Sequence, residues 1–184
     1  MQTTTYPSVG WGKETFQPLN LSQTACEFEW TVQPGGSVPE HLHQEANEHF
    51  KVLEGEVTFK LGGKTIVAKA GDEVVIPRQI LHSVSNKSNG VTRCLVWFTP
   101  AADQSKFFQI LLFLKGENQQ GMKAVLQAMF ISNQLNYKEF STVKGGMKVV
   151  ENLMMRYFKL TAPLTGWDKL VRRFVQGAIK PVAG

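Results

Sequence analysis

The chain has 184 residues, of which 42% are hydrophobic and 19% are charged, and it contains no low-complexity tract. This composition is that of a globular protein able to bury its own core, which excludes a disordered chain or a disulfide-stapled miniprotein. The formal net charge of +5 is unevenly divided: residues 1–100 carry net −2 and residues 101–184 carry net +7, which predicts two parts with different surfaces.

The two cysteines, Cys26 and Cys94, are far apart in the chain and form no CxxC pair. The first twenty residues lack the basic start and apolar run of a secretory signal. The longest apolar stretch, residues 107–114, is too short to span a bilayer. We therefore expect a soluble cytoplasmic protein whose thiols are reduced.

From about residue 26 to residue 98 the sequence consists of short, strand-like runs separated by turn signals. In chain order, the runs are 26–32, 49–61, 65–77, 81–86 and 91–98. The segment LGGK at 61–64 predicts a tight hairpin. Many short strands at regular spacing favour an all-β sandwich or barrel.

After Pro100 the spacing of apolar residues changes from 2 to about 3.6, which is typical of helices. We expect a first helix from a cap at Asp103 to about Leu114, and a second over roughly 118–133. A third stretch begins with a capping-box pattern at Asn136 and Glu139, is broken at Gly145-Gly146, and continues toward Phe158. The last helix, over 166–180, carries one apolar face and one basic face.

Two of the four histidines lie in the segment HLHQEANE at 41–48, which ends in a glutamate. Residues two apart on a strand share a face, so His41 and His43 are expected to point into the barrel while Leu42 points out. The loop that follows must bring Glu48 to the same place, and His82 arrives from a separate strand.

Two groups of residues have a spacing that is specific when taken together. In order they are Gly35, His41, His43, Glu48 and Gly55, then Gly71, Pro77, His82 and Asn86. This pattern resembles the two motifs of the cupin family over roughly residues 20–100, with Gln79 standing where glycine is usual. The resemblance implies a cupin jelly-roll barrel over residues 1–100, with its motif core at 35–86, followed by an α-helical region at 101–184.

The resemblance and the residue types together predict one metal site made by His41, His43, Glu48 and His82. Such a set suits a divalent first-row transition metal ion, with iron or manganese favoured and zinc, nickel and copper as alternatives. The absence of cysteine from the set argues against a structural zinc site. Glu45 is an alternative carboxylate ligand, whereas His49 is expected to face away from the site.

Resemblance to metal cupins such as the quercetin dioxygenases implies a metal-dependent oxidoreductase acting on a small organic substrate. In that interpretation Glu48 also acts as a catalytic base if it leaves the metal. The alternatives are a non-redox metal cupin, an isomerase or a lyase, in which the ion is a Lewis acid, or a small-ligand-binding module without catalysis.

The resemblance further implies a homodimer. The helical region is expected to pack on the barrel or on a second subunit; a lid over the metal pocket and contact of 166–180 with an anionic membrane are alternatives. We expect no nucleic-acid partner, because aromatic and basic residues do not interleave and no known module is present.

Overall fold

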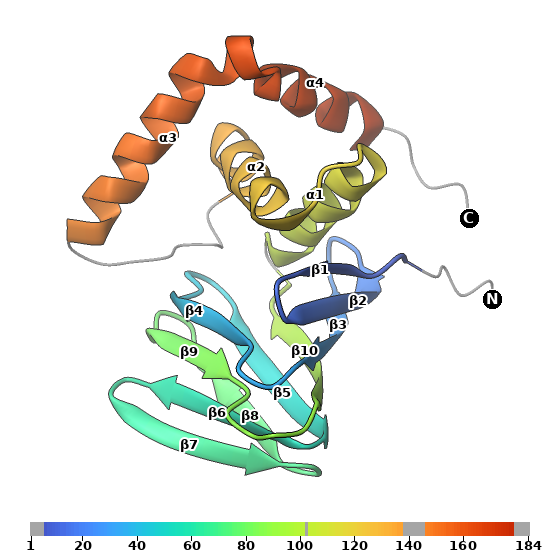
Figure 1. Ribbon diagram of the computed structural model, residues 1–184, viewed down its shortest axis with the longest axis vertical. Coiled ribbons are helices and arrows are strands. Elements are labelled where there is room, and N and C mark those ends of the chain that lie inside the picture. Colours follow the sequence, from blue (N-terminus) through green and yellow to red (C-terminus); the bar gives the residue numbers. More distant parts are fainter. Residues whose placement is uncertain (1–5, 102, 138–145, 179–184) are drawn as a thin grey trace.

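The computed structural model describes residues 6–101, 103–137 and 146–178, which form two β-sheets and a layer of helices at one end of them (Figure 1). The larger sheet has the strand order β1-β2-β3-β10-β5-β8, and the smaller has the order β4-β9-β6-β7. The strands are β1 (Val9–Trp11), β2 (Glu14–Leu21), β3 (Cys26–Val32), β4 (Ser37–His41), β5 (Asn47–Glu54), β6 (Glu56–Leu61), β7 (Lys64–Lys69), β8 (Glu73–Ile76), β9 (His82–Ser85) and β10 (Thr92–Thr99).

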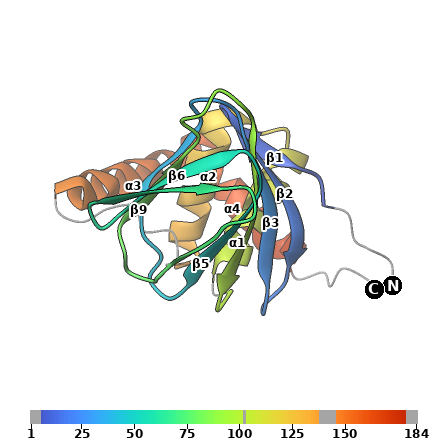
Figure 2. The ribbon, with the colours of Figure 1, turned by 90° about the horizontal axis from the view of Figure 1, so that it is seen from below.

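The alternation in the sequence corresponds to strands that bury every second side chain. In β3, the residues Cys26, Phe28, Trp30 and Val32 are all buried, while the three residues between them are partly exposed. Each run predicted between residues 26 and 98 contains a strand, and the predicted hairpin joins β6 to β7. These strands form a jelly-roll pair of sheets that face each other across an apolar core (Figure 2).

The turn at Gly55 shows why a glycine stands between β5 and β6. Its φ is +76°, and a Cβ there would come within 2.6 Å of the carbonyl oxygen of Val91. A larger residue would therefore clash with the backbone before β10, in addition to the strain of a positive φ. The turn lets β5 run in the larger sheet and β6 in the smaller one.

In the described part of the chain four helices follow the sheets, so the description all-β holds only for the first hundred residues. They are α1 (Gln104–Gly116), α2 (Gly121–Gln134), α3 (Gly146–Thr165) and α4 (Trp167–Ala178). Asp103 is the N-cap residue of α1, but its side chain makes no capping hydrogen bond and instead contacts Lys106 at 2.7 Å. Glu139, Gly145 and Lys180 of the predicted helices lie outside the described residues.

The first helix extends the core of the sheets instead of forming a separate one. The ring of Phe108 in α1 lies 4.4 Å from that of Phe28 in β3, between ring centroids, and 5.8 Å from that of Phe16 in β2. Phe107, Phe108 and Leu111 are buried in the same cluster as the strand residues. Helix α1 is therefore anchored on the larger sheet, and α2 packs in turn against α1.

Within the described part of the chain, no helix is long and apolar enough to cross a membrane.

Substitution of Glu14 by glutamine is expected to stabilise the protein above neutral pH. Burial raises the pKa of Glu14 to about 7, although a hydrogen bond from the Ser37 backbone acts to lower it. The native state therefore binds the proton of Glu14 more tightly than the unfolded chain does. The free energy of unfolding therefore falls as pH rises from about 4.5 to 7. The full shift corresponds to about 3 kcal/mol, which partial solvation reduces to roughly 1–2 kcal/mol.

Urea unfolding of the wild type and of Glu14→Gln between pH 4.5 and 8 measures this effect. The stability difference in favour of the variant should grow across that interval and level off above pH 7. Parallel stability curves for the two proteins would show that Glu14 ionises normally in the native state.

Candidate metal centre

The four residues predicted as ligands meet between the two sheets. His41 ends β4 and pairs directly with His82 at the start of β9, so both imidazoles come from the smaller sheet. Glu48 lies in β5 of the larger sheet, and His43 follows β4 by two residues. All four side chains are buried, between 1% and 6% exposed. One ligand atom from each lies within 4.8 Å of the others.

The distances around Glu48 suit a metal after small movements. Its Oε2 lies 3.1 Å from Nε2 of His82 and 3.4 Å from Nε2 of His43. The contact between Glu48 and His43 is electrostatic, because Nε2 of His43 has no hydrogen-bond partner among the described residues. Atoms bound to one ion at about 2.1 Å lie up to about 4.2 Å apart, so a maximum of 4.8 Å needs movements of a few tenths of an ångström.

Two of the imidazoles are held in the tautomer that a metal requires. The carbonyl oxygen of Pro39 lies 2.8 Å from Nδ1 of His41, and that of Ile80 lies 2.9 Å from Nδ1 of His82. A carbonyl oxygen can only accept, so each Nδ1 carries the proton and donates it. Each Nε2 is then the atom that faces the centre, which is the usual arrangement of metal-binding histidines.

The third imidazole, that of His43, is held by a residue of the helical region that was not predicted from the sequence. The side-chain amide Nε2 of Gln104, the first residue of α1, lies 2.7 Å from Nδ1 of His43, and both side chains are buried. The two residues are 61 positions apart. No local pattern marked Gln104, because it stands at a helix start with no motif around it.

The charges of the centre favour a cation. Burial would raise the pKa of Glu48, but the neighbouring His43 and His82 outweigh it and hold that pKa below its usual range. Burial and the charge of His82 lower the pKa of His41 to about 4, so its imidazole is neutral at neutral pH. Burial lowers the pKa of His82, but the Glu48 carboxylate raises it by more, so that this pKa lies above its usual value. A carboxylate thus stays ionised among nitrogen ligands in a buried site.

The other residues considered near the site lie outside the cluster. Leu42 is buried, and β4 ends one residue before it, at His41. Glu45 is exposed in the loop. His49 faces away, as predicted: its ring stacks on Trp97, and its Nε2 lies 2.6 Å from Oγ1 of Thr99.

Two further positions of the motif region, Gln79 and Asn86, have defined structural roles. Gln79 adopts φ +64°, the left-handed conformation that glycine would take, and its backbone N–H donates to the carbonyl of His43. His82 still reaches the cluster, so the substitution leaves the ligand set intact. Asn86 is fully buried and donates from Nδ2 to the carbonyl oxygens of Val32 and Gly90.

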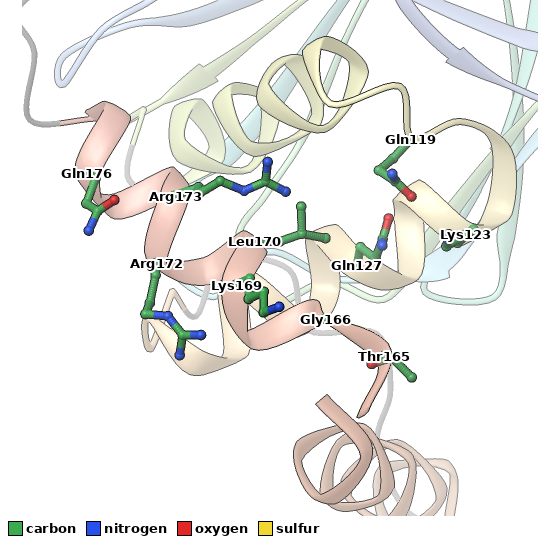
Figure 3. Close-up of a pocket in the computed structure, with 10 residues that line it drawn as sticks. All are labelled: Gln119, Lys123, Gln127, Thr165, Gly166, Lys169, Leu170, Arg172, Arg173 and Gln176. Atoms are coloured by element: carbon green, nitrogen blue, oxygen red, sulfur yellow. The ribbon is translucent and has the colours of Figure 1, made fainter. Parts of the chain in front are cut away.

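A separate recess of about 690 Å³ lies in the helical region, between α2 and α4 (Figure 3). Four basic residues line it, namely Lys123, Lys169, Arg172 and Arg173. Two of these cations are already paired within the chain, Arg172 with Asp168 at 2.8 Å and Arg173 with Glu117 at 2.6 Å. The basic face predicted over 166–180 therefore partly serves to join α4 to the rest of the helical layer.

Comparison with known proteins finds a family match over part of the β-structured region. The family model "Cupin domain" matches residues 28–98. The HTH-type transcriptional regulator PuuR of Escherichia coli (strain K12) is 33% identical over 81 residues, which cover 44% of each protein. Oxalate oxidase GF-3.8 of Triticum aestivum is 30% identical over 116 residues, covering 59% of this chain and 49% of the oxidase. The chain spans about half the length of these curated relatives.

Solved structures of similar fold cover the same part. A predicted oxalate decarboxylase from Thermotoga maritima is 25% identical, with a TM-score of 0.48 over 53% of this chain and 95% of that one. An RmlC-like cupin from Shewanella frigidimarina NCIMB 400 is 20% identical, with a TM-score of 0.49 over 56% and 91%. The family match, the two facing sheets and the buried histidine–glutamate cluster together support membership of residues 28–98 in the cupin superfamily.

Proposed function

We propose that this protein binds one divalent first-row transition metal ion through His41, His43, Glu48 and His82 and acts as an oxidoreductase on a small organic substrate. The observation that carries the proposal is the buried cluster itself, with four ligand atoms within 4.8 Å of one another. In it, Nε2 of His43 is buried without a hydrogen-bond partner in the described chain. A buried polar nitrogen without a partner costs free energy, which binding of a metal ion at that atom would offset.

The donor set fits iron or manganese better than a structural zinc ion. Three neutral imidazoles and one carboxylate suit iron, and the carboxylate admits manganese, while the usual thiolates of structural zinc are missing. Such an ion supplies Lewis acidity and one-electron redox chemistry when bound. With four protein ligands it keeps one or two positions for a substrate oxygen.

The chain's own residues have distinct parts in this proposal. Glu48 offsets one positive charge and can hold a proton taken from the substrate if its carboxylate leaves the ion. The ring of Phe98 lies 5.0 Å from that of His43, between centroids, and adds an apolar wall on the side of β10. A closed, partly apolar site of this kind favours a small substrate and excludes bulk water.

The relative named oxalate oxidase supports the oxidoreductase class, and the resemblance to quercetin dioxygenases supports chemistry of the dioxygenase kind. Non-redox isomerisation or elimination by the same ion is the alternative within enzymes. A second candidate function is a ligand-binding module without catalysis. The match to the regulator PuuR favours it, because that relative is named for regulation and not for turnover.

Substitution of Glu48 by glutamine tests the catalytic part of the proposal. The amide keeps the shape of the side chain but cannot take a proton, so turnover per bound metal should fall at least about 100-fold. Oxygen uptake with a panel of small carboxylic acids and flavonols, divided by metal content from elemental mass spectrometry, gives this value. Glu45→Gln, an exposed carboxylate in the same loop, should leave it unchanged.

Equal turnover per metal in Glu48→Gln would remove the catalytic role of Glu48 and leave it a ligand only. A fully loaded protein that takes up no oxygen and alters none of these compounds would move the proposal to the ligand-binding module.

A further inference from the structure

Helix α3 exposes a row of large apolar side chains that the fold does not cover. The row, which we call the α3 stripe, consists of Val149, Val150, Leu153, Tyr157, Leu160 and Leu164. Each is between 58% and 89% exposed. Isolated apolar residues on a surface are ordinary, but a contiguous row of six marks an interaction site.

The spacing of the stripe is that of a helix-pairing seam. From Val150 to Leu164 its members follow one another at intervals of three, four, three and four residues. Apolar residues at these intervals form one face of a helix and interlock with another helix that has the same repeat.

The opposite face of α3 is already used by the fold. Met155 and Ala162 are buried, and the ring of Phe158 lies 4.7 Å from that of Trp167, between centroids. Helix α3 therefore has two apolar faces, of which only one is covered. It stands at the outer edge of the helical layer (Figure 1) and projects beyond the sheets in the orthogonal view (Figure 2). All six side chains of the stripe are more than half exposed.

We propose that the α3 stripe is a dimer interface in which α3 packs against α3 of a second copy of this chain. The size of the stripe supports a protein partner: six such side chains offer on the order of 600 Å² of apolar surface, the upper limit for a patch on a monomer. A standard interface buries about 800 Å² on each partner, so the stripe would form the apolar centre of such an interface. A two-fold axis pairs one patch with itself, so the partner needs no other complementary surface.

The charges around the α3 stripe fit a second copy of this chain better than a lipid surface. The charged residues among the described side chains of α3 are Glu151, Arg156 and Lys159, which are of both signs. An interfacial membrane helix has a strongly basic polar face and a free apolar face. Helix α4 carries more of the basic residues, but its apolar residues Leu170 and Phe174 are buried against the helical layer. The basic and the exposed apolar surfaces thus lie on different helices.

Sedimentation velocity of the full chain, from about 1 to 100 μM, tests the proposal. We expect a dimer for the wild type and at least a 100-fold larger dissociation constant for the double variant Leu153→Glu, Leu160→Glu. Both positions are more than half exposed, so circular dichroism and metal content should stay those of the wild type. Met122→Glu is the matched control, since Met122 is 64% exposed on α2 but lies outside the stripe.

Three results would overturn the proposal: a wild type that stays monomeric at 100 μM, a dimer that survives the double substitution, or a dimer that Met122→Glu disrupts equally. Co-sedimentation with phosphatidylserine–phosphatidylcholine vesicles distinguishes the rival occupant. Vesicle binding by a monomeric wild type, lost in the double variant, would assign the stripe to a membrane surface. None of these results depends on whether the cupin centre binds metal.

Discussion

Replacement of His82 by alanine is expected to remove the bound metal. The wild type, purified without chelators, should hold about one equivalent of metal per chain, and the variant less than about a tenth of that. His82 supplies one of four ligand atoms, and its imidazole also contacts Oε2 of Glu48 at 3.1 Å. Its loss opens a cavity in the centre and leaves the carboxylate with one imidazole fewer. Elemental mass spectrometry on both proteins measures the metal content.

His49→Ala is the matched control, because it removes the fourth histidine without touching the cluster. It should keep the metal content of the wild type. A wild type that holds no metal, and takes up none when iron, manganese, nickel or zinc is added, would contradict the metal-site proposal itself. About one equivalent of zinc or nickel would retain the site but favour non-redox chemistry.

Replacement of Gln104 by leucine is expected to weaken metal binding about 10- to 100-fold, the usual effect of removing a residue that holds a metal-binding histidine. As the amide is oriented, Nε2 of Gln104 donates to Nδ1 of His43, which places the imidazole proton on Nε2. Metal binding through Nε2 requires the proton on Nδ1, and the amide then turns by 180° to accept it through its oxygen. Leucine can make neither contact.

Gln104→Glu separates this role from simple packing. A carboxylate at position 104 can accept the Nδ1 proton of His43 without turning, so this variant should bind metal as tightly as the wild type or more tightly. Competition with a chromophoric chelator gives the affinities of all three proteins. If leucine and glutamate weaken binding equally, Gln104 only fills space between α1 and the sheets.

The strands could be predicted to the extent that their sequences alternate. Strand β3 alternates over its whole length and was predicted at its true bounds. Strands β1 and β2 were missed and β4 was predicted only around His41, because β1 has three residues and the other two contain Pro18 and Pro39, which weaken the strand signal. In β2 the register shifts immediately after Pro18. Strand β4 pairs with β9, which lies too far along the chain for a local window to contain it.

The residues of the candidate metal cluster were predictable because spacing along two short motifs carries them. His41 and His82 come from adjacent strands, and the motif spacing encodes that pairing. The local geometry was less predictable: the strand expected to carry both His41 and His43 ends at His41. The cap assigned to Asp103 assumed a side-chain bond that its contact with Lys106 replaces.

The periodicities, the two-part division of charge and the residues of the candidate metal cluster could be predicted from the sequence, because each depends on residues close together or in fixed motifs. That Gln104 reaches His43 across 61 residues depends on the packing of α1 against the sheets. The tertiary structure also decided which apolar helix faces are covered. Helices α1 and α3 both have apolar faces in sequence, yet α1 is buried against the larger sheet and the α3 stripe is open. The periodicity of a helix specifies that an apolar face exists, whereas what covers it depends on the packing of the whole chain.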